Sequence, residues 1–267
     1  MPEAAPSDLL LTRRDARGVL TLTLNQPERF NVLSEPMLVA LQAAVDAAAT
    51  DEGLRVLVLA ATGRAFCAGH DLKAMAAPGL AQADHQALFD RCSRFMLSLQ
   101  RLPVPVLARV QGMATAAGCQ LVAQCDLAVA STEATFATSG IRYGLYCATP
   151  SVPLTRNVSA KKALEMLFTG DFIDAQEALA QGLLNRVVSP AELDGAVETL
   201  LQSLLHKPRA ALAMGKALFY RQREAGVEAA YQLAAQTMAL NMMDPAAQEG
   251  ARAFTEKRVP RWVPQGD

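Results

Sequence analysis

The stretch that most constrains the fold runs from residue 104 to residue 126, VPVLARVQGMATAAGCQLVAQCD. It begins with β-branched and apolar residues between Pro103 and Gly112, which is typical of a strand covered on both faces. The small-residue turn ATAAG follows, and helix-forming residues continue over 119–124. A helix that begins in such a turn directs its free N–H groups at any ligand lying against the turn. The sequence therefore predicts a turn that stabilises a developing oxyanion, between a buried strand and a helix.

A second small-residue turn follows another predicted strand. Residues 55–60 are apolar and indicate a strand, and the loop TGRAFCAGHDLK over 62–73 comes directly after it. Asp71 in this loop precedes a short helical segment, a position that favours short carboxylates as helix caps. The chain therefore contains two small-residue turns, each preceded by a buried strand.

The rest of the chain alternates strands and helices before becoming entirely helical. Further strands are predicted at residues 18–24, 127–130 and 184–188, and helices at 82–101 and 160–168. Capping signals at Ser34, Asp174 and Ser189 predict the starts of three more helices. We expect residues 135–146 to form an irregular pocket wall. The pattern predicts an α/β core.

Three successive helices are predicted after residue 207, at 208–222, 227–243 and 246–257. This change from alternating elements to helices alone indicates a boundary. We therefore expect an α/β core at 1–206 and a C-terminal helical region at 207–267.

Composition excludes several classes of protein. Apolar residues make up 51% of the 267 residues and charged residues 19%, without an apolar run long enough to span a membrane. The net charge of −1, with Lys and Arg scattered, argues against binding to nucleic acid or to an acidic membrane surface. No metal-ligand spacing and no nucleotide-binding glycine motif occurs in the sequence. The five cysteines lack C-x-x-C spacing and no export signal begins the chain, so we expect reduced thiols and a cytoplasmic location.

Five stretches, in the correct order and spacing, resemble the crotonase (enoyl-CoA hydratase/isomerase) superfamily. They are NQPERFNVLS, RAFCAGHDLK, PVLARVQGMATAAGCQLVAQCDLAVAS, ALEMLFTGDFIDAQEALAQGLLNRVV and QEGARAFTEKRVPRW. The resemblance implies an α/β fold built as a spiral of ββα units with a C-terminal helical trimerisation region. It also implies a homotrimer, or a hexamer of two trimers, that acts on acyl-CoA thioesters. Coenzyme A would then arrive as part of the substrate, with no permanently bound cofactor.

The resemblance also implies roles for individual residues. In the family two backbone N–H groups hold the thioester oxygen, and they correspond here to His70 and Ala117. Coenzyme A contacts would come from Ala68, His70, Asp71 and Leu72 in the first turn and from Arg29, which lies near the phosphates. Phe254 and Lys257 would reach the ligand from a neighbouring subunit.

The sequence departs from the family at both positions where hydratases carry a glutamate. Gln120 stands at the first position and Gly140 at the second. An amide can orient water or the thioester, but neither residue moves a proton at neutral pH. General acid and base groups contribute about 10² to 10⁴ each to the rate. We therefore expect weak or absent hydration of simple enoyl-CoA.

Two other residues are candidates for chemistry. Cys147 lies in the region where relatives with other activities place Tyr or Asp, and it is either a functional thiol or a small wall residue. The side chain of His70 is a candidate base, because GHD occurs in some decarboxylases of the superfamily, although its backbone N–H is the favoured role.

Three functional hypotheses remain. The first is an enzyme that stabilises an enolate or oxyanion with little proton transfer, as in decarboxylation or thioester cleavage. The second is a non-catalytic acyl-CoA-binding protein that retains the fold and has lost the acids. A serine hydrolase is disfavoured, because G-x-S-x-G is absent and Ser139 and Ser151 have no placed histidine.

Overall fold

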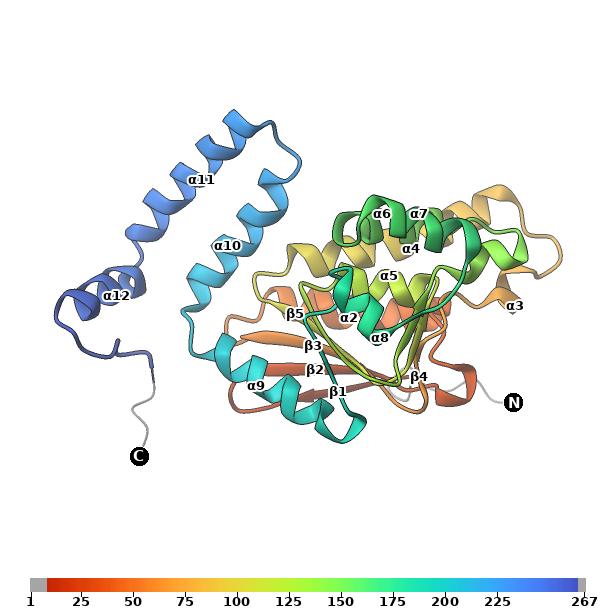
Figure 1. Ribbon diagram of the computed structural model, residues 1–267, viewed down its shortest axis with the longest axis horizontal. Helices are drawn as coiled ribbons and strands as arrows, with labels where there is room; N and C mark the ends of the chain where they lie inside the picture. The colour runs from red at the N-terminus through yellow and green to blue at the C-terminus, as the bar shows by residue number, and fades with distance from the viewer. Residues whose placement is uncertain (1–8, 264–267) are drawn as a thin grey trace.

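The structure is a computed structural model that describes residues 9–263 (Figure 1). Its larger sheet has the strand order β1-β2-β3-β5-β7-β10, in which all neighbours are parallel except β1 and β2. The strands are β1 Leu10–Arg14, β2 Val19–Leu24, β3 Val56–Ala61, β5 Val106–Val110, β7 Leu127–Ser131 and β10 Arg186–Val188. The predicted strands at 18–24, 55–60, 104–110, 127–130 and 184–188 are confirmed within two residues at each end.

A smaller sheet has the order β4-β6-β8-β9. Its strands are β4 Ala65–Cys67, β6 Met113–Thr115, β8 Thr135–Ala137 and β9 Ile173–Asp174. The chain visits the larger sheet and then the smaller one three times in succession, as β3 and β4, β5 and β6, and β7 and β8. Each pair is followed by a helix, so the predicted spiral of ββα units is confirmed.

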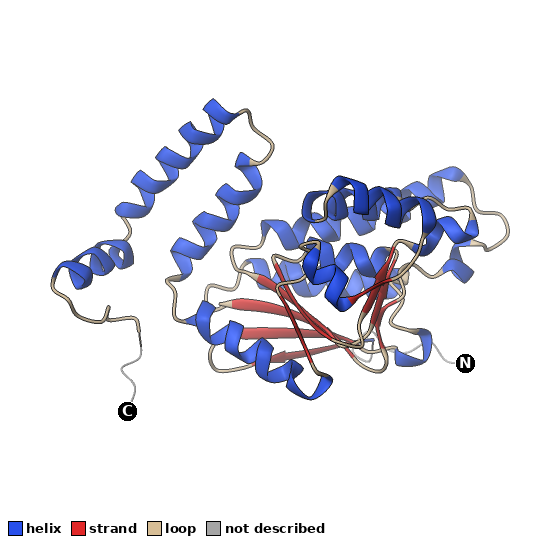
Figure 2. Cartoon of the chain, viewed as in Figure 1, coloured by secondary structure: helices blue, strands red, loops and turns tan. Residues whose placement is uncertain are grey.

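Helices cover both faces of the larger sheet (Figure 2). Alternation along β2 directs Leu22 and Leu24 to the main core, which also contains Leu38 and Leu41 of α2, and Val19 to the opposite face. On that opposite face α9 supplies the covering apolar side chains. The helices of the core are α2 Glu35–Ala49, α3 Leu72–Met75, α4 Gln82–Arg101, α5 Ala117–Gln124, α6 Ala148–Asn157, α7 Ala160–Thr169, α8 Ala175–Ala180 and α9 Leu193–Leu205. Short 3₁₀ helices lie at Pro27–Arg29, Ser139–Tyr143 and Pro190–Glu192.

The predicted caps of α2 and α8 are present. Ser34 Oγ accepts from Met37 N at 3.4 Å at the start of α2, and Asp174 Oδ1 accepts from Glu177 N at 2.8 Å at the start of α8. Ser189 forms the predicted capping box with Glu192, which begins a 3₁₀ turn that leads into α9.

The C-terminal helices form an arm that extends away from the core in Figure 1. They are α10 Arg209–Gln222, α11 Val227–Met242 and α12 Pro245–Thr255. Neither α10 nor α11 contains a buried residue. The division at residue 207 stays a prediction, and the described arm begins two residues after it.

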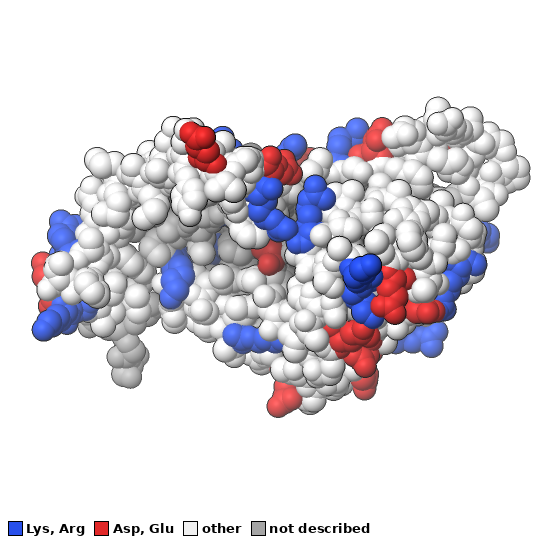
Figure 3. Space-filling model, turned by 45° about the horizontal axis from the view of Figure 1, so that its top comes forward, with Lys and Arg blue, Asp and Glu red and all other residues white. Residues whose placement is uncertain are grey.

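Residues 135–146 are more regular than we predicted. They contain β8 and the 3₁₀ helix Ser139–Tyr143 in place of an irregular wall. None of the described helices is long and apolar enough to cross a membrane. On the face drawn in Figure 3, Lys and Arg side chains alternate with Asp and Glu, without an extended area of one sign.

Candidate active site

The two predicted turns lie against each other. Gly69, in the first turn, has a φ of 91°, and a Cβ there would lie 2.9 Å from Ala116 Cβ and 3.1 Å from Ala117 N. In the second turn, a Cβ on Gly118 would lie 2.0 Å from the carbonyl oxygen of Cys67. Only glycine permits these approaches. The small residues of both turns are therefore explained by backbone packing at one point.

The second turn presents free backbone donors. The N–H of Gln120 donates to the carbonyl of Ala116 at 3.0 Å, which is the first hydrogen bond of α5. The N–H of Ala117, the first residue of α5, therefore has no acceptor within the helix. Ala116 itself has φ 51° and ψ −120°, a strained conformation for a residue with a side chain, and its N–H donates to Ala137 O at 3.0 Å. Such strain is characteristic of ligand-binding turns.

A cavity of about 440 Å³ opens where the turns meet. We call it the turn cavity. It is lined by six of the predicted site residues, namely Ala68, His70, Leu72, Ala117, Gly140 and Cys147. Apolar side chains such as Met75, Phe89 and Met113 form much of the remaining wall. Its size and apolar lining, with a few polar groups, are typical of a small-molecule site.

The His70 imidazole is a largely buried part of the wall. Its Nδ1 lies 3.4 Å from the carbonyl oxygen of Leu33, and its buried Nε2 has no hydrogen-bond partner among the described residues. The ring of Phe89 meets it edge-on, with 5.6 Å between centroids. Burial lowers the pKa of His70, which outweighs the opposing effect of the Leu33 carbonyl.

The space beside Gly140 is filled. A Cβ at this position would lie 2.6 Å from the carbonyl oxygen of Leu145 and 2.9 Å from Cys147 Sγ. The N–H of Leu145 donates to the carbonyl of Gly140 at 3.1 Å, which closes the chain over this position. Position 140 therefore lacks a carboxylate and also lacks the room for one.

The Cys147 thiol is buried, with 6% of the residue exposed. Burial raises its pKa above the ordinary value, although a hydrogen bond with the Gly140 backbone acts in the opposite direction. A raised pKa favours the neutral thiol over the thiolate nucleophile. The structure thus favours the wall role for Cys147.

Gln120 lies in the first turn of α5 and is not among the residues that line the turn cavity. The residue is buried, and its Oε1 has no partner among the described residues. Thr115 and Ser139 also line the turn cavity, with 2.7 Å between Thr115 Oγ1 and Ser139 Oγ, and we did not predict this hydroxyl pair. Phe89 was also not predicted as a site residue, although it lies one helical turn before Cys92, a buried residue of α4.

Arg29 and Asp71 form an ion pair outside the turn cavity. Asp71 also caps α3 as predicted, because its Oδ1 accepts from Lys73 N at 3.2 Å and Ala74 N at 3.3 Å. The Arg29 side chain is half-exposed, so it remains accessible to an anionic group.

Phe254 lies in α12 and Lys257 follows this helix, and α12 lies at the opposite end of the molecule from α3, which lines the turn cavity (Figure 1). Phe254 is 85% exposed. A single chain therefore does not bring these two residues to the other predicted site residues.

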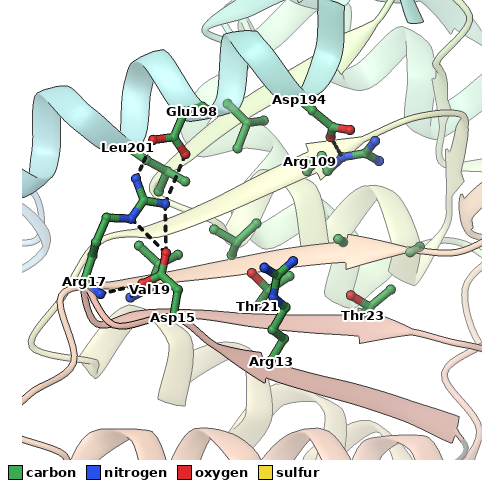
Figure 4. A pocket seen from close by; sticks show the side chains of 14 residues that line it. Arg13, Asp15, Arg17, Val19, Thr21, Thr23, Arg109, Asp194, Glu198 and Leu201 are labelled. Atoms are coloured by element: carbon green, nitrogen blue, oxygen red, sulfur yellow. Dashed lines mark hydrogen bonds and ion pairs between the residues drawn. The ribbon is translucent and has the colours of Figure 1, made fainter. Parts of the chain in front are cut away.

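A second cavity of about 580 Å³ lies on the face of the larger sheet beside α9 (Figure 4). Its charged side chains are largely paired with one another. Arg17 lies between Asp15 and Glu198, with 2.9 Å from Arg17 Nε to Asp15 Oδ2. Arg109 Nε donates to Asp194 Oδ1 at 2.6 Å. None of the predicted site residues lines this cavity, and no His, Cys, Asp or Glu cluster suited to a metal occurs among residues 9–263.

Comparison with known proteins identifies the family. The model of the enoyl-CoA hydratase/isomerase family matches residues 14–265. Mitochondrial enoyl-CoA hydratase domain-containing protein 3 of Rattus norvegicus is 43% identical over 262 residues, which cover 98% of this chain and 86% of the relative. The crystal structure of an enoyl-CoA hydratase from Mycobacterium smegmatis matches with a TM-score of 0.94 and 59% identity, over 95% of this chain and 98% of that one. The human domain-containing protein 3 structure matches with a TM-score of 0.91 and 42% identity, over 95% of this chain and all (100%) of that one. The chain therefore belongs to the enoyl-CoA hydratase/isomerase family.

Proposed function

We propose that this protein binds acyl-CoA thioesters in the turn cavity and holds the thioester oxygen with the N–H groups of His70 and Ala117. The observation that carries the proposal is the contact between the two turns, which brings both residues to one cavity wall. Backbone donors fixed in a buried turn stabilise a developing oxyanion without reorganising. The names of the relatives, which refer to enoyl-CoA hydratases, support this class of ligand.

We further propose that ordinary hydration of enoyl-CoA is weak or absent. Gln120 supplies no proton, and Gly140 has backbone and sulfur atoms where a side chain would begin. Loss of two acid–base groups removes about 10² to 10⁴ in rate for each. The protein is then either an enzyme for a different acyl-CoA reaction or an acyl-CoA-binding protein.

The first experiment measures binding and hydration on one sample. Calorimetry with coenzyme A and crotonyl-CoA reports binding, and loss of the conjugated thioester absorbance reports hydration. We expect binding without hydration at ordinary family rates. Absence of binding by the assembled protein would overturn the proposed ligand, and rapid hydration would overturn the proposed loss of activity.

A proline substitution tests the oxyanion donor. Ala117→Pro removes one N–H at the first position of α5, where a helix has no internal hydrogen bond to lose. We expect weaker binding of acyl-CoA with retained helical circular dichroism. Ala160→Pro makes the same change at the start of α7, outside the turn cavity, and should bind normally. Equal binding by both variants would contradict the role of Ala117.

We propose that three copies assemble through the arm, as a trimer or as paired trimers, and that Phe254 and Lys257 complete the site of a neighbouring copy. The arm exposes large apolar side chains, including Val227, Tyr231, Met238, Met243 and Phe254. Exposed apolar surface of this extent is characteristic of an interface. Light scattering on the full chain should give a mass that is a multiple of three copies, and a monomer that binds acyl-CoA fully would overturn the assembly.

The cytoplasmic location also stays a proposal, testable by cell fractionation.

A further inference from the structure

The peptide bond between Gly69 and His70 is held in one orientation by Leu33. The N–H of Leu33 donates to the carbonyl of Gly69 at 2.8 Å. In a trans peptide the carbonyl and the N–H point to opposite sides of the chain. The N–H of His70 therefore points away from Leu33, and no described carbonyl accepts from it. The direction of this donor is thus set by the position of Leu33.

The segment that carries Leu33, residues 26–33, contacts the first turn at further points, and we call it the brace. The N–H of Ala68 donates to the carbonyl of Phe30 at 3.0 Å. Arg29 of the brace forms the ion pair with Asp71. The first turn is therefore held along most of its length by a segment that lies far away from it in the sequence.

The Asn31 side chain connects the brace to the strands beside it. Asn31 is fully buried, and its Nδ2 donates to the carbonyls of Thr62 and Ala65, both at 2.8 Å. Its Oδ1 accepts from the N–H of Gln26 at 2.8 Å. Thr62 directly follows β3, and Ala65 begins β4, the strand that leads into the first turn. One amide therefore fixes the brace relative to the start of this strand, and both of its N–H groups are used.

The backbone conformation alone does not require this amide. Phe30 and Asn31 have φ values of 53° and 54°, in the left-handed region that glycine adopts readily. Residues with side chains keep such a conformation where their surroundings enforce it. The three side-chain hydrogen bonds of Asn31 are the contacts that a glycine at this position would not make.

We propose that Asn31 is a positioning residue, whose amide holds the brace so that Leu33 directs the N–H of His70 at the thioester oxygen of a bound acyl-CoA. This inference rests on the oxyanion role proposed above. Asn31 does not line the turn cavity, so its effect passes through Leu33 and Gly69. Fixed donors stabilise a developing oxyanion because they need no reorganisation. A loosened brace therefore weakens the polarisation of the thioester carbonyl without removing the donor.

Infrared spectroscopy of a bound ligand measures this polarisation. Hydrogen bonds to a carbonyl oxygen weaken the C=O bond and lower its stretching frequency. We expect butyryl-CoA, labelled with carbon-13 at the thioester carbonyl, to show this lowering in the wild-type protein and to lose most of it in Asn31→Gly. Asn31→Asp keeps the volume and the acceptor for Gln26 but loses the amide donors to Thr62 and Ala65. It should show the same loss and provides the test if Asn31→Gly does not fold.

Binding measurements separate the thioester oxygen from the rest of the ligand. Coenzyme A without an acyl group has no thioester carbonyl, so we expect Asn31→Gly to bind it like the wild type in calorimetry. Binding of butyryl-CoA should weaken by about 2- to 13-fold, which corresponds to the net contribution of one hydrogen bond.

Asn185→Gly is the matched control. Asn185 Oδ1 accepts from the N–H of Ala128 at 2.8 Å, and neither residue lines the turn cavity. This variant should lose stability and keep the full carbonyl shift. A full shift in Asn31→Gly, or equal losses of binding for both ligands, would overturn the inference.

The wild-type protein distinguishes this inference from the proposed function. Butyryl-CoA bound without any carbonyl shift would overturn the inference together with the oxyanion role and would leave the proposed ligand intact. Absence of binding would overturn the ligand as well. A shift in the wild type that persists in Asn31→Gly would overturn the role of Asn31 alone.

Discussion

The carbonyl oxygen of Leu145 lies 2.6 Å from the point where a Cβ on Gly140 would begin. This contact is with backbone, so it is not relieved by turning a side chain. The backbone at Leu145 therefore closes over position 140 and leaves no room for a longer side chain. We therefore expect that Gly140→Glu alone does not give the protein hydratase activity.

The Gly140 contact predicts a loss of stability for even the smallest side chain. Gly140→Ala should lower the free energy of unfolding by about 1 to 3 kcal/mol, because the methyl group overpacks the wall. Gly195→Ala in α9 is the matched control, since nothing lies within 4 Å of a Cβ there, and it should raise stability by about 0.5 to 1 kcal/mol. Denaturant unfolding measures both. If Gly140→Ala leaves the free energy of unfolding unchanged, the backbone at Leu145 moves to make room for the methyl group.

At Ala116, where the backbone is strained, we expect a substitution by glycine to stabilise the protein. A residue held at φ 51° and ψ −120° costs about 1 to 3 kcal/mol, and glycine adopts this conformation readily. Ala116→Gly should therefore raise the free energy of unfolding by about 1 kcal/mol. Ala47→Gly, at an exposed position within α2, should lower it by about 1 kcal/mol. Equal losses in the two variants would show that Ala116 carries no strain.

The arm is fixed near its root by an ion pair that is largely shielded from solvent, with the Lys216 and Asp126 side chains 8% and 16% exposed. Lys216 Nζ lies 2.7 Å from Asp126 Oδ2 and also donates to the carbonyls of Leu99 and Val104, at 2.8 and 2.9 Å. Lys216→Met leaves Asp126 without its counter-charge and should cost about 3 to 5 kcal/mol.

A double-mutant cycle with Asp126→Asn measures this pair directly. The double variant should lose less stability than the sum of the two single variants, because neither charge is then left alone. Arg14→Ala breaks an exposed pair with Asp51 and should change stability by less than about 1 kcal/mol. If the double variant loses as much free energy of unfolding as the two single variants together, Lys216 and Asp126 do not stabilise each other.

The pKa of His70 predicts a pH dependence of stability. Burial lowers this pKa in the folded state from the ordinary 6.5, so the unfolded chain binds a proton more readily. The stability contributed by neutral His70 is present above pH 6.5 and is lost as the pH falls below it. Unfolding at pH 7.5 and at pH 5.5 should show a smaller loss in His70→Gln than in the wild type. Identical losses would mean that the pKa of His70 is unshifted by folding.

Local patterns predicted the long elements of the fold and the two turns. The helix at 82–101 agrees with α4 at both ends, because its apolar stripe persists over 20 residues and Pro103 follows it. The strands β4, β6 and β8 have three residues each, too few for an alternating pattern to emerge. We made no prediction of α6, which contains Pro150 and Pro153, residues that ordinarily argue against a helix.

The chemistry of the candidate site was only partly predictable. The two small-residue turns could be predicted from the sequence, because the close backbone packing within each turn requires small residues at those positions. The filled space beside Gly140 was not, because it depends on how the chain returns at Leu145 and Cys147. The unpaired Nε2 of His70 likewise depends on Leu33, which lies far away in the sequence and meets His70 through an isolated bridge.

Because α10 and α11 contain no buried residue, the assembly proposed above would make folding of the arm depend on protein concentration. Helices of this length gain most of their stability from packing of an apolar face, and within one copy no residue of α10 or α11 is buried. When copies associate through the arm, assembly supplies that packing, and the midpoint of thermal unfolding then rises with protein concentration by mass action. Dilution would therefore loosen the arm first, while the α/β core around the turn cavity keeps its own apolar interior.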